Sequence, residues 1–523
     1  MVAALMTRQD KIVVQIAVCQ VNLEIRNSMK RIAIIGGGIT GLASAYRLAE
    51  RGRELGEAVE ILLLEADSRL GGVIQTQFRD GFLLEGGPDC FISEKPETVS
   101  LARRLGIDSK LISTNEKHRR SFIVRNGKLR AVPQGFQLLA PSKVWPFITT
   151  NIFSFAGKAR IAADLLIPRK RNGNDDESLA SFVRRRLGKE ALSRMAQPMV
   201  GGIYTADPER LSLRATFPRF LEMEAKHRSI ILGLLQNAHT ASRDENSSTS
   251  GARYSLFLSF DRGMQLLVET LARHVDDTRV PGSGFDVTST VRFKKKVEEL
   301  RLERRGHGLQ WRIRTSKGEE FGCDSVCLAV PSYVSAHLLR NIAPALATEL
   351  RSIQYASTAT INLAFRTEDI PHRLDGFGFV VPIIENRSLI ACSFSSVKFP
   401  GRAPEGCVLL RAFVGGALQP EMFELGASGM IARVRADLRD LLKIENKPLF
   451  AEVTKWPHSM PQYEIGHLAR LERIRTELQN LPGVRIAGNF FQGAGISDCI
   501  RSGESEMDAL IDTFKTQSQR NIN

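Results

Sequence analysis

The sequence predicts an α/β protein whose principal parallel sheet is assembled from separated stretches of the chain. Three short apolar runs support this prediction: residues 31–35 near the start, 325–331 beyond the middle and 484–486 near the end. Such runs are typical of strands that are buried on both faces of a parallel sheet. At 523 residues the chain is longer than one hydrophobic core usually supports, so two or three domains are expected.

The composition is that of a globular protein of enzyme size. Hydrophobic residues make up 43% and charged residues 25%, which argues against a disordered chain or a membrane-spanning bundle. The net charge of +15 would suit nucleic acid, an anionic membrane surface or an acidic substrate. No nucleic-acid-binding motif accompanies the basic clusters, so we predict solvated basic faces and no nucleic-acid partner.

The seven cysteines are scattered and odd in number, which is typical of a reducing, cytoplasmic environment. Cys323 and Cys327 lack a second pair of ligands at zinc spacing, so we interpret them as buried thiols and predict no metal site. Residues 1–28 contain an apolar run that is too short to span a bilayer and is followed by no cleavage pattern. We interpret these residues as an N-terminal extension without an assigned function.

A glycine-rich turn follows the first apolar run, and apolar residues at helical spacing follow the turn. Gly36 and Gly38 would permit a tight turn and a close approach of the backbone to a pyrophosphate, which would face the helix N-terminus. Gly41 would let the helix and the strand pack closely. The residues assigned to this turn are Gly36, Gly37, Gly38, Ile39, Thr40 and Gly41.

A second apolar run, residues 59–64, ends in Glu65. This order places a carboxylate at the tip of the second strand, where it can accept hydrogen bonds from the ribose hydroxyls of an adenosine. A dinucleotide site is predicted by the combination of these features: a strand, a glycine turn, a helix, a second strand and a terminal acid. A glycine turn in some other α/β unit would leave Glu65 unexplained.

Two later segments favour FAD over NAD. Residues 69–73 lie just past the acid, and residues 82–89 repeat the glycine pattern. Both resemble the flavin-proximal segments of the amine oxidase and protoporphyrinogen oxidase superfamily. The resemblance implies FAD as the cofactor, with contacts from Ala66, Arg69, Gly72, Val73, Gly87, Pro88, Asp89 and Cys90.

The end of the chain completes the expected flavin site. Residues 484–489 predict a strand ending in a turn, and residues 493–500 predict a loop that enters a helix near Ser497 or Asp498. A helix N-terminus at this place would stabilise negative charge on a reduced flavin. The flavin contacts expected here are Gly488, Ala494, Gly495 and Ile496.

The resemblance to the protoporphyrinogen oxidase family becomes specific in ordered blocks. Residues 197–213, 260–267, 460–467 and 487–503 are similar to blocks of that family, and the likeness spans about residues 30 to 515. Generic amine oxidases share the two ends of the pattern. They lack the Pro-Gln-Tyr block at residues 461–463 and the Gly-Ile-Tyr block at residues 202–204.

This resemblance implies a discontinuous, Rossmann-like FAD-binding domain at residues 29–114, 236–335 and 456–515. A helical insertion at residues 115–235, a mixed-sheet substrate domain at 336–455 and a tail at 516–523 complete the expected organisation. Val297 would contact FAD through its backbone, and Trp456 would also contact the cofactor. Residues 242–253 are polar and serine-rich, and they predict a surface loop.

Around residues 144–167 aromatic and aliphatic residues alternate with Lys143, Lys158 and Arg160. A core-facing helix and a helix resting on a membrane interface give the same pattern. We favour peripheral membrane contact, because basic residues flank the apolar face.

Residues 355–416 alternate in the manner of long antiparallel strands, whose inward aromatic side chains would form the floor of a flat pocket. By the family's pattern a tetrapyrrole would lie against six residues, each of which core packing alone would also explain. These residues are Met199, Gly202, Phe377, Val380, Phe394 and Phe413.

The resemblance implies FAD-dependent oxidation of protoporphyrinogen IX to protoporphyrin IX by molecular oxygen, a late step of haem biosynthesis. No protein acid or base is assigned, because the cofactor supplies the chemistry. The substrate's propionates call for a cation. The spacing places Ser121 where the family has an arginine, so either Arg120 reaches that carboxylate or the substrate differs.

The nearest alternative is a coproporphyrinogen III oxidase of the same fold, because such relatives lack this arginine. An amine oxidase or a carotenoid desaturase is a more distant alternative, and a flavin-binding scaffold without activity is the remaining one. The family further implies attachment to the cytoplasmic membrane, a homodimer and hand-over of the product to a ferrochelatase.

Overall fold

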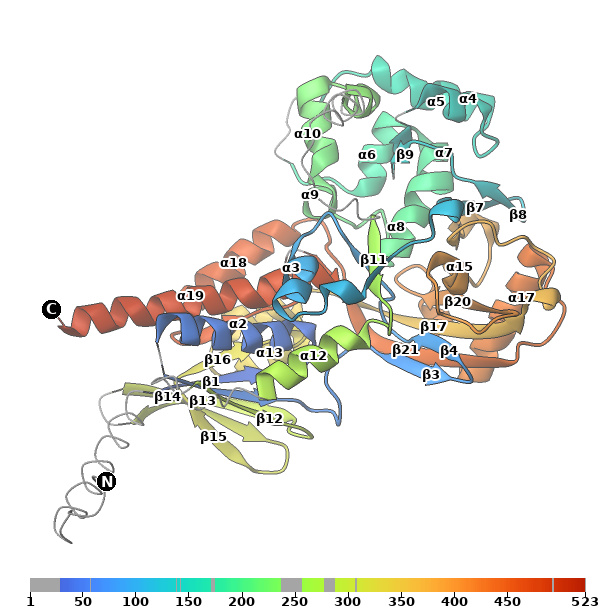
Figure 1. Ribbon diagram of the computed structural model, residues 1–523. Coiled ribbons are helices and arrows are strands. Elements are labelled where there is room, and N and C mark those ends of the chain that lie inside the picture. The colour runs from blue at the N-terminus through green and yellow to red at the C-terminus, as the bar shows by residue number, and fades with distance from the viewer. Residues whose placement is uncertain are drawn as a thin grey trace, which may run out of the picture.

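A computed structural model describes residues 29–56, 58–137, 139–141, 143–170, 175–236, 256–276, 287–305, 308–491 and 493–522 (Figure 1). The N-terminal extension at residues 1–28 and the serine-rich loop at 242–253 lie outside these residues. In the described part of the chain, no helix combines the length and the apolar character needed to cross a bilayer.

Five parallel strands of the described chain form the nucleotide-binding sheet, in the order β12 (Val287–Arg292), β2 (Val59–Leu64), β1 (Lys30–Ile35), β16 (Ser325–Leu328) and β22 (Val484–Ile486). Strand β1 pairs with β2 and with β16, so strands from distant parts of the chain lie side by side. The predicted α/β class and the discontinuous parallel sheet are confirmed.

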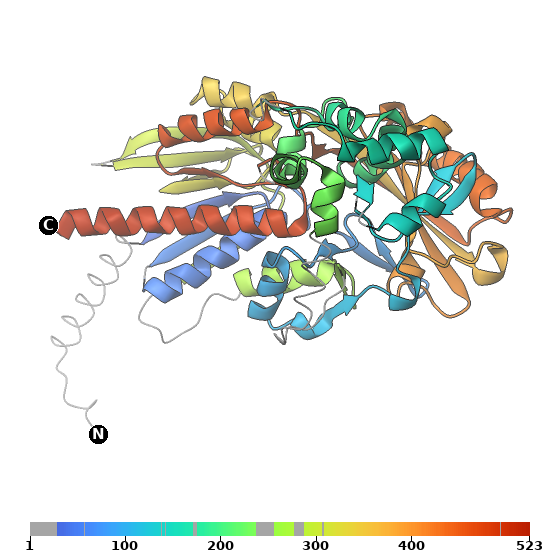
Figure 2. The ribbon, with the colours of Figure 1, turned by 90° about the horizontal axis from the view of Figure 1, so that it is seen from above.

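Both faces of this sheet are covered, which explains why its strands read as unbroken apolar runs. Ile32 and Ile34 pack against α2 (Ile39–Leu55), α12 (Gln265–Asp276) and α19 (Ile496–Ile522). Ala33 and Ile35 pack on the other face, against β13 (Val297–Arg305), β14 (Gly308–Thr315) and helices α13 (Ser332–Leu339), α14 (Pro344–Arg351) and α18 (His467–Gln479). Figure 2 shows α2 and α19 running side by side over the sheet.

Seven strands of the described residues form a mixed sheet, in the order β21 (Phe450–Pro461), β17 (Tyr355–Arg366), β20 (Cys407–Gly415), β19 (Ala391–Phe394), β18 (Gly378–Val380), β7 (Phe122–Arg125) and β8 (Lys128–Ala131). All neighbours are antiparallel except β18 and β7. The strands expected between residues 355 and 416 are present. Helix α17 (Ala427–Leu442) packs its apolar side against this sheet.

Four structural elements do not follow the domain limits expected from the motifs. Strands β7 and β8 lie in the stretch expected to be a helical insertion, but they extend the mixed sheet. Strand β21 runs unbroken through Trp456, which was placed at the start of the third FAD segment. Helix α19 continues to Ile522, through most of the expected tail. The expected domain limits were drawn from motifs for ligand-binding segments. Strands and helices do not end at these limits, because their ends are set by sheet pairing and packing.

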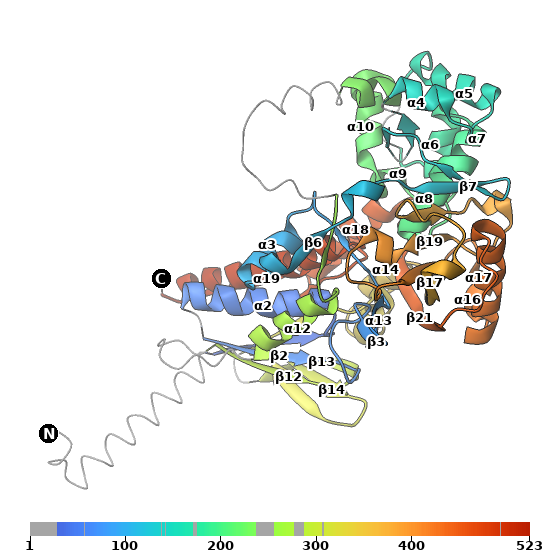
Figure 3. The same ribbon diagram turned by 45° about the vertical axis from the view of Figure 1, so that its right-hand side comes forward.

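The helical part has a core of its own and stands above the mixed sheet (Figures 1 and 3). A fully buried ion pair between Arg186 and Asp164, 2.5 Å apart, ties it together. Its helices are α4 (Val144–Thr149), α5 (Phe155–Ala162), α6 (Leu179–Arg186), α7 (Lys189–Ala191), α8 (Gln197–Tyr204), α9 (Leu213–Thr216) and α10 (Pro218–His227). Of these, α8 contacts β18 of the mixed sheet.

Shorter elements connect the three parts. They are β3 (Thr76–Arg79), β4 (Phe82–Glu85), β5 (Phe91–Ile92), α3 (Glu97–Arg104), β6 (Leu111–Ser113), β9 (Phe136–Gln137), β10 (Ala140–Pro141), β11 (Phe257–Phe260), β15 (Glu320–Cys323), α15 (Ser395–Lys398) and α16 (Pro420–Glu424).

Candidate active site

The glycine turn between β1 and α2 leaves no room for a side chain at most of its positions. Gly36 has a φ of +106°, and a Cβ on Gly41 would overlap the carbonyl oxygen of Gly36. A Cβ on Gly37 would meet the Glu65 carboxylate at 2.9 Å. At Gly38 the surroundings are open, with no neighbouring atom of the described chain within 4 Å of its Cβ position. The turn therefore has space for a ligand in front of Gly38.

Helix α2 begins at Ile39 without a side-chain cap and without an acidic residue in its first turn. The first N–H groups of a helix have no partners within the helix, and the helix dipole makes this end positive. The start of α2, including Thr40, therefore suits a pyrophosphate.

Glu65 stands beside this turn. Its carboxylate accepts hydrogen bonds from the N–H groups of Gly37 at 2.6 Å and Asp67 at 2.7 Å. Each carboxylate oxygen can accept a further bond, so capacity remains for ribose hydroxyls. The N–H of Lys295 donates to the carbonyl of Glu65 at 2.8 Å, which brings the start of β13 at Val297 to the same place. Ala66, which follows Glu65, is exposed.

The loop at residues 69–73 is fastened to the glycine turn. The guanidinium of Arg69 donates to the carbonyl oxygens of Gly72 and Ile74, which closes the loop on itself. The N–H of Gly71 donates to the carbonyl of Gly37 at 2.8 Å. Arg69 therefore acts on the cofactor site by shaping this loop.

The second glycine segment is fastened to the mixed sheet. The indole N–H of Trp456 and the hydroxyl of Thr360 both donate to the carbonyl of Gly86 at 2.8 Å. A Cβ on Gly87 would overlap the carbonyl of Val73, so the two loops touch. The nucleotide-binding part and the mixed sheet are thus joined where their lining residues meet.

A cavity of about 440 Å³ lies where these segments converge, and we name it the flavin-proximal cavity. It sits at the carboxyl ends of β1 and β22, the edge at which open α/β sheets bind their ligands. Twelve of the residues expected to contact cofactor or substrate line it: Ile39, Val73, Gly87, Pro88, Asp89, Cys90, Gly202, Phe413, Trp456, Ala494, Gly495 and Ile496.

The third FAD segment closes the cavity. Helix α19 begins at Ile496, at the predicted place, and directs its N-terminus at the cavity that Ala494 and Gly495 line. Gly488 follows β22, and its N–H donates to the Ser502 hydroxyl at 3.0 Å. An open glycine turn, an uncapped helix start and a cavity lined by all these segments fit FAD. When bound there, FAD supplies a two-electron acceptor.

One edge of the cavity carries a cation that the sequence did not indicate. Lys95 is half-exposed, and its ammonium lies 2.6 and 2.7 Å from the two carboxylate oxygens of Asp498. Arg501 also binds Asp498. Lys95 is therefore placed to hold an anionic substrate group while it keeps Asp498 paired.

The floor of the cavity holds a group of buried charges. Lys398 lies 2.9 Å from Asp89, and Arg411 lies 3.6 Å from it. Burial alone would raise the pKa of Asp89, but the charges of Lys398 and Arg411 hold it well below its usual range. Burial, with Asp89 nearby, raises the pKa of the Cys90 thiol to about 12, so Cys90 is not a thiolate nucleophile.

Several residues expected at the tetrapyrrole lie away from the cavity. Phe394 is fully buried in the core of the mixed sheet, 6.0 Å from the ring of Phe379. Met199 and Val380 pack at the edge of the helical core. Phe377 lies at the far end of β18, where its N–H donates to the carbonyl of Arg120. A strand's pleat decides which side its residues face, and the motif spacing did not resolve it.

Arg120 also lies away from the cavity, in contrast to the role expected for it. Its guanidinium binds the carboxylate and the carbonyl oxygen of Asp375, at the surface. The guanidinium lies 5.6 Å from the centre of the buried ring of Phe122. Arg120 is therefore committed to a partner in the protein.

Lys95, Lys398 and Arg411 were missed by the sequence reasoning. The sequence does contain an indication for Arg411, because it is the single charged residue in the apolar run of residues 408–414. A buried charge that interrupts such a strand is costly unless it is paired, which marks it as a candidate. Lys95 lies in a turn and Lys398 in the short helix α15, and only the fold brings Lys95 to the cavity and Lys398 to Asp89, which lines it.

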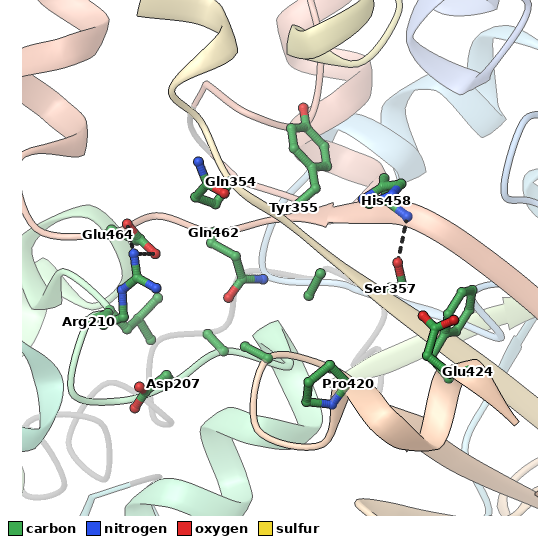
Figure 4. Close-up of a pocket in the computed structure, with 16 residues that line it drawn as sticks. Asp207, Arg210, Gln354, Tyr355, Ser357, Pro420, Glu424, His458, Gln462 and Glu464 are labelled. Atoms are coloured by element: carbon green, nitrogen blue, oxygen red, sulfur yellow. Dashed lines mark hydrogen bonds and ion pairs between the residues drawn. The ribbon is translucent and has the colours of Figure 1, made fainter.

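A second cavity, of about 350 Å³, lies behind β17 and β21 (Figure 4). Ser357 lines this cavity and its neighbour Thr358 lines the flavin-proximal one, so a single layer of backbone separates them. Its lining includes the carboxylates of Asp207, Glu424 and Glu464. Arg210 is bound to Glu464 at 2.9 Å. Because the segments expected at the flavin line the flavin-proximal cavity and not this one, the flavin-proximal cavity is the candidate active site.

Comparison with known proteins agrees with this site. The sequence profile of the family described as flavin containing amine oxidoreductase matches residues 39–511. A coproporphyrinogen III oxidase of Bacillus subtilis (strain 168) is 34% identical over 488 residues, which cover 93% of this chain and 99% of that protein. Protoporphyrinogen oxidase 2 of Arabidopsis thaliana is 27% identical over 508 residues, which cover 94% of this chain and 96% of that protein.

A solved structure gives the same result. The crystal structure of a candidate protoporphyrinogen oxidase from Exiguobacterium sp. 255-15 superposes with a TM-score of 0.78 at 29% identity, and the match covers 92% of this chain and 98% of that one. Fold, cavity and likeness together define an FAD-dependent oxidoreductase. The chain belongs to the flavin-containing amine oxidoreductases and, within them, to the porphyrinogen oxidase family.

Proposed function

We propose that this protein oxidises coproporphyrinogen III to coproporphyrin III, with molecular oxygen as the final acceptor. The observation that carries the choice of substrate is the position of Arg120, which Asp375 holds at the surface. The arginine expected for protoporphyrinogen is therefore not at the cavity. The coproporphyrinogen III oxidase of Bacillus subtilis, at 34% identity, supports the same choice.

The chain's own residues provide a largely apolar, shaped cavity for this reaction. Ile39, Val73, Phe413 and Met460 give it apolar walls, which suit a flat macrocycle. Excluding water protects an oxygen-sensitive substrate and strengthens each electrostatic contact inside the cavity. Binding and orientation are therefore the protein's contribution, and the cofactor performs the redox step.

The substrate's propionates need cations at the cavity edge, and Lys95 is the half-exposed cation that lines the cavity. The ammonium of Lys95 has three N–H donors, and two of them donate to the carboxylate of Asp498. A propionate at the cavity mouth would take the third. Coproporphyrinogen carries more propionates than protoporphyrinogen and so offers more groups that can occupy this position.

Protoporphyrinogen IX remains the second candidate substrate. The relative from Arabidopsis thaliana, at 27% identity over almost the whole chain, favours it. Parallel measurements of kcat/KM for both porphyrinogens in air, read as porphyrin fluorescence, distinguish the two. A higher kcat/KM for protoporphyrinogen IX would overturn the choice of coproporphyrinogen.

We also propose that the tip of the helical part rests on an anionic membrane surface. Trp145 is 74% exposed, Phe155 is 91% exposed and Leu166 is 79% exposed, all within the predicted amphipathic segment. Lys158 lies over the Phe155 ring at 5.6 Å, and Lys143 is exposed beside α4. Exposed apolar side chains flanked by lysines suit a lipid interface.

A further inference from the structure

A third, much smaller cavity lies under the floor of the flavin-proximal cavity, and we call it the small void. Its volume is about 10 Å³, the size that one water molecule occupies. It lies between β4, β17, β20 and α15. The lining residues are Leu83, Glu85, Asp89, Asn362, Ser395, Phe399, Arg402, Leu409 and Arg411.

Three polar atoms of this lining have no hydrogen-bond partner among the described residues: Asn362 Oδ1, Ser395 Oγ and Arg411 Nε. Their residues are 2%, 6% and 3% exposed, so bulk water does not reach them. A buried polar atom without a partner costs about 1–3 kcal/mol. Three such atoms around one void indicate a common partner inside it.

The chemistry of these atoms selects that partner. Asn362 donates through its Nδ2 to the carbonyl of Glu85 at 3.1 Å, so its Oδ1 is an acceptor. Arg411 Nε can only donate. A water molecule can donate to Asn362 and accept from Arg411. An anion would be repelled by the amide oxygen, and a metal ion would be repelled by the guanidinium.

Two of the lining residues reach the cavity above. Asp89 and Arg411 line both the small void and the flavin-proximal cavity. The Nζ of Lys398 holds Asp89 at 2.9 Å on the same floor. A water in the void would therefore lie one side chain away from a substrate in the cavity.

Glu85 also lines the void, at the end of β4. Its carboxylate accepts hydrogen bonds from the Thr76 hydroxyl at 2.7 Å and from the Met264 N–H at 2.8 Å. The charged groups that face it are Arg411 and Arg402, with Asp89 beyond. Burial outweighs these two cations and raises the pKa of Glu85 to about 7.

The proposed reaction creates a need for such a group. Each two-electron oxidation breaks a methylene C–H bond, whose hydride equivalent the cofactor takes, and a pyrrole N–H bond, whose proton is released. Reduction of molecular oxygen to hydrogen peroxide consumes that hydride equivalent and one proton. The proton is therefore released first and used later, and a group that stores it in between keeps the cycle balanced.

We propose that the void holds one ordered water, which joins Asp89 and Arg411 at the cavity to Glu85, and that Glu85 stores the proton between the two half-reactions. This inference rests on the proposed porphyrinogen oxidation. Glu85 does not touch the substrate, so it is a positioning and proton-storing residue. The water site itself is a property of the fold.

The first test does not depend on activity. Between about pH 5 and pH 7 the folded wild type keeps Glu85 protonated while the unfolded chain releases that proton, so its stability falls as pH rises across this window. The Glu85→Gln variant loses this dependence. The unfolding temperature of the variant minus that of the wild type therefore increases as pH rises to 7. The comparison variant is Glu506→Gln, because Glu506 also has a raised pKa but lies on α19, away from the flavin-proximal cavity and the small void. It is expected to lose only its own contribution to the pH dependence and to keep that of Glu85. Equal pH profiles for wild type and Glu85→Gln would overturn the proposal.

The second test follows the proton in the FAD-loaded enzyme. Under anaerobic conditions at pH 7, coproporphyrinogen III is mixed with the enzyme in weak buffer that contains an indicator dye. Wild type and Glu506→Gln are expected to release less proton per bleached flavin than Glu85→Gln. Equal release from all three would overturn the storage role. Absence of flavin bleaching would instead contradict the proposed function, and the stability test would still decide on Glu85.

Discussion

Gly41 and Gly38, both in the turn after β1, have different surroundings. Substituting Gly41 should therefore affect protein stability, and substituting Gly38 should affect cofactor binding. A Cβ on Gly41 would overlap backbone, whereas a Cβ on Gly38 would enter open space. We expect Gly41→Ala to lower the thermal stability of the apoprotein. Gly38→Ala is expected to leave apoprotein stability nearly unchanged and to weaken FAD binding about tenfold or more, because the added methyl group occupies the pyrophosphate's place. Equal FAD affinity of Gly38→Ala and wild type would show that the pyrophosphate lies elsewhere.

Substitution of Lys95 should test most directly whether the protein binds the substrate's carboxylates at this edge of the cavity. A hydrogen bond to a charged group contributes about 1.5–3 kcal/mol, so Lys95→Met should raise the KM for coproporphyrinogen III about tenfold or more. Lys95→Arg keeps the charge and should restore most of the affinity. The control is the flavin spectrum, which should not change. An unchanged KM in Lys95→Met would remove this residue from the substrate site.

The residues that could be predicted are those whose function lies in the backbone of a contiguous motif. The glycine turn, Glu65 and the loop at residues 494–496 are where the motifs placed them. Arg120 and Phe394 show the limit, because the first is held by Asp375 and the second faces the core. The direction of a side chain depends on pleat and partners that spacing does not contain. Lys95 reaches the cavity, and Lys398 reaches Asp89 on its floor, only through tertiary folding.

At the scale of elements, α4 and α5 carry the prediction about the membrane. Each exposed aromatic side chain that enters a lipid interface contributes about 1.5–3 kcal/mol. The double variant Trp145→Gln/Phe155→Ser should therefore bind vesicles containing anionic lipid at least about tenfold more weakly in a sedimentation assay. The double variant Phe78→Ser/Leu309→Gln, which removes exposed apolar residues outside the helical part, is the control. Equal binding by both double variants would contradict membrane contact through this tip.

The helical part depends on one buried ion pair. Arg186 and Asp164 are fully buried, and Asp164 also accepts a hydrogen bond from the Ser229 hydroxyl at 2.5 Å. Glu224 also lies 3.6 Å from Arg186, so Asp164→Asn removes the nearer of two carboxylates that balance this buried charge. Breaking a buried pair costs up to about 3–5 kcal/mol. Asp164→Asn should therefore expose residues 144–236 to protease at a lower temperature than in the wild type. Protection equal to that of the wild type would show that the hydrogen-bonded network tolerates the lost charge.

Element types were predictable where burial imposes a clear pattern. The central parallel strands are covered on both faces, so β1 and β2 are largely apolar, and β17 and β20 were found because they are long and are buried over most of their length. Strands β7 and β8 were missed within the expected insertion. They are short, and β7 joins the mixed sheet through β18, far away in the sequence. Pairing between distant short strands leaves little trace in local composition.

At the scale of the whole molecule, the site exists only because distant segments converge. The flavin-proximal cavity takes residues from positions 39 to 499, and segments that follow strands of the parallel sheet, strands of the mixed sheet and α8 all contribute to it. This convergence explains why the family profile spans residues 39–511. The homodimer and the hand-over of product to a ferrochelatase stay predictions.

The central claim is that the FAD-loaded protein oxidises a porphyrinogen and prefers coproporphyrinogen III. Anaerobic stopped-flow mixing with coproporphyrinogen III or protoporphyrinogen IX, followed as loss of oxidised-flavin absorbance, tests it most directly. We expect bleaching by both substrates, with a larger second-order rate constant for coproporphyrinogen III. A larger rate constant for protoporphyrinogen IX would contradict the substrate choice, and no bleaching by either would contradict porphyrinogen oxidation itself.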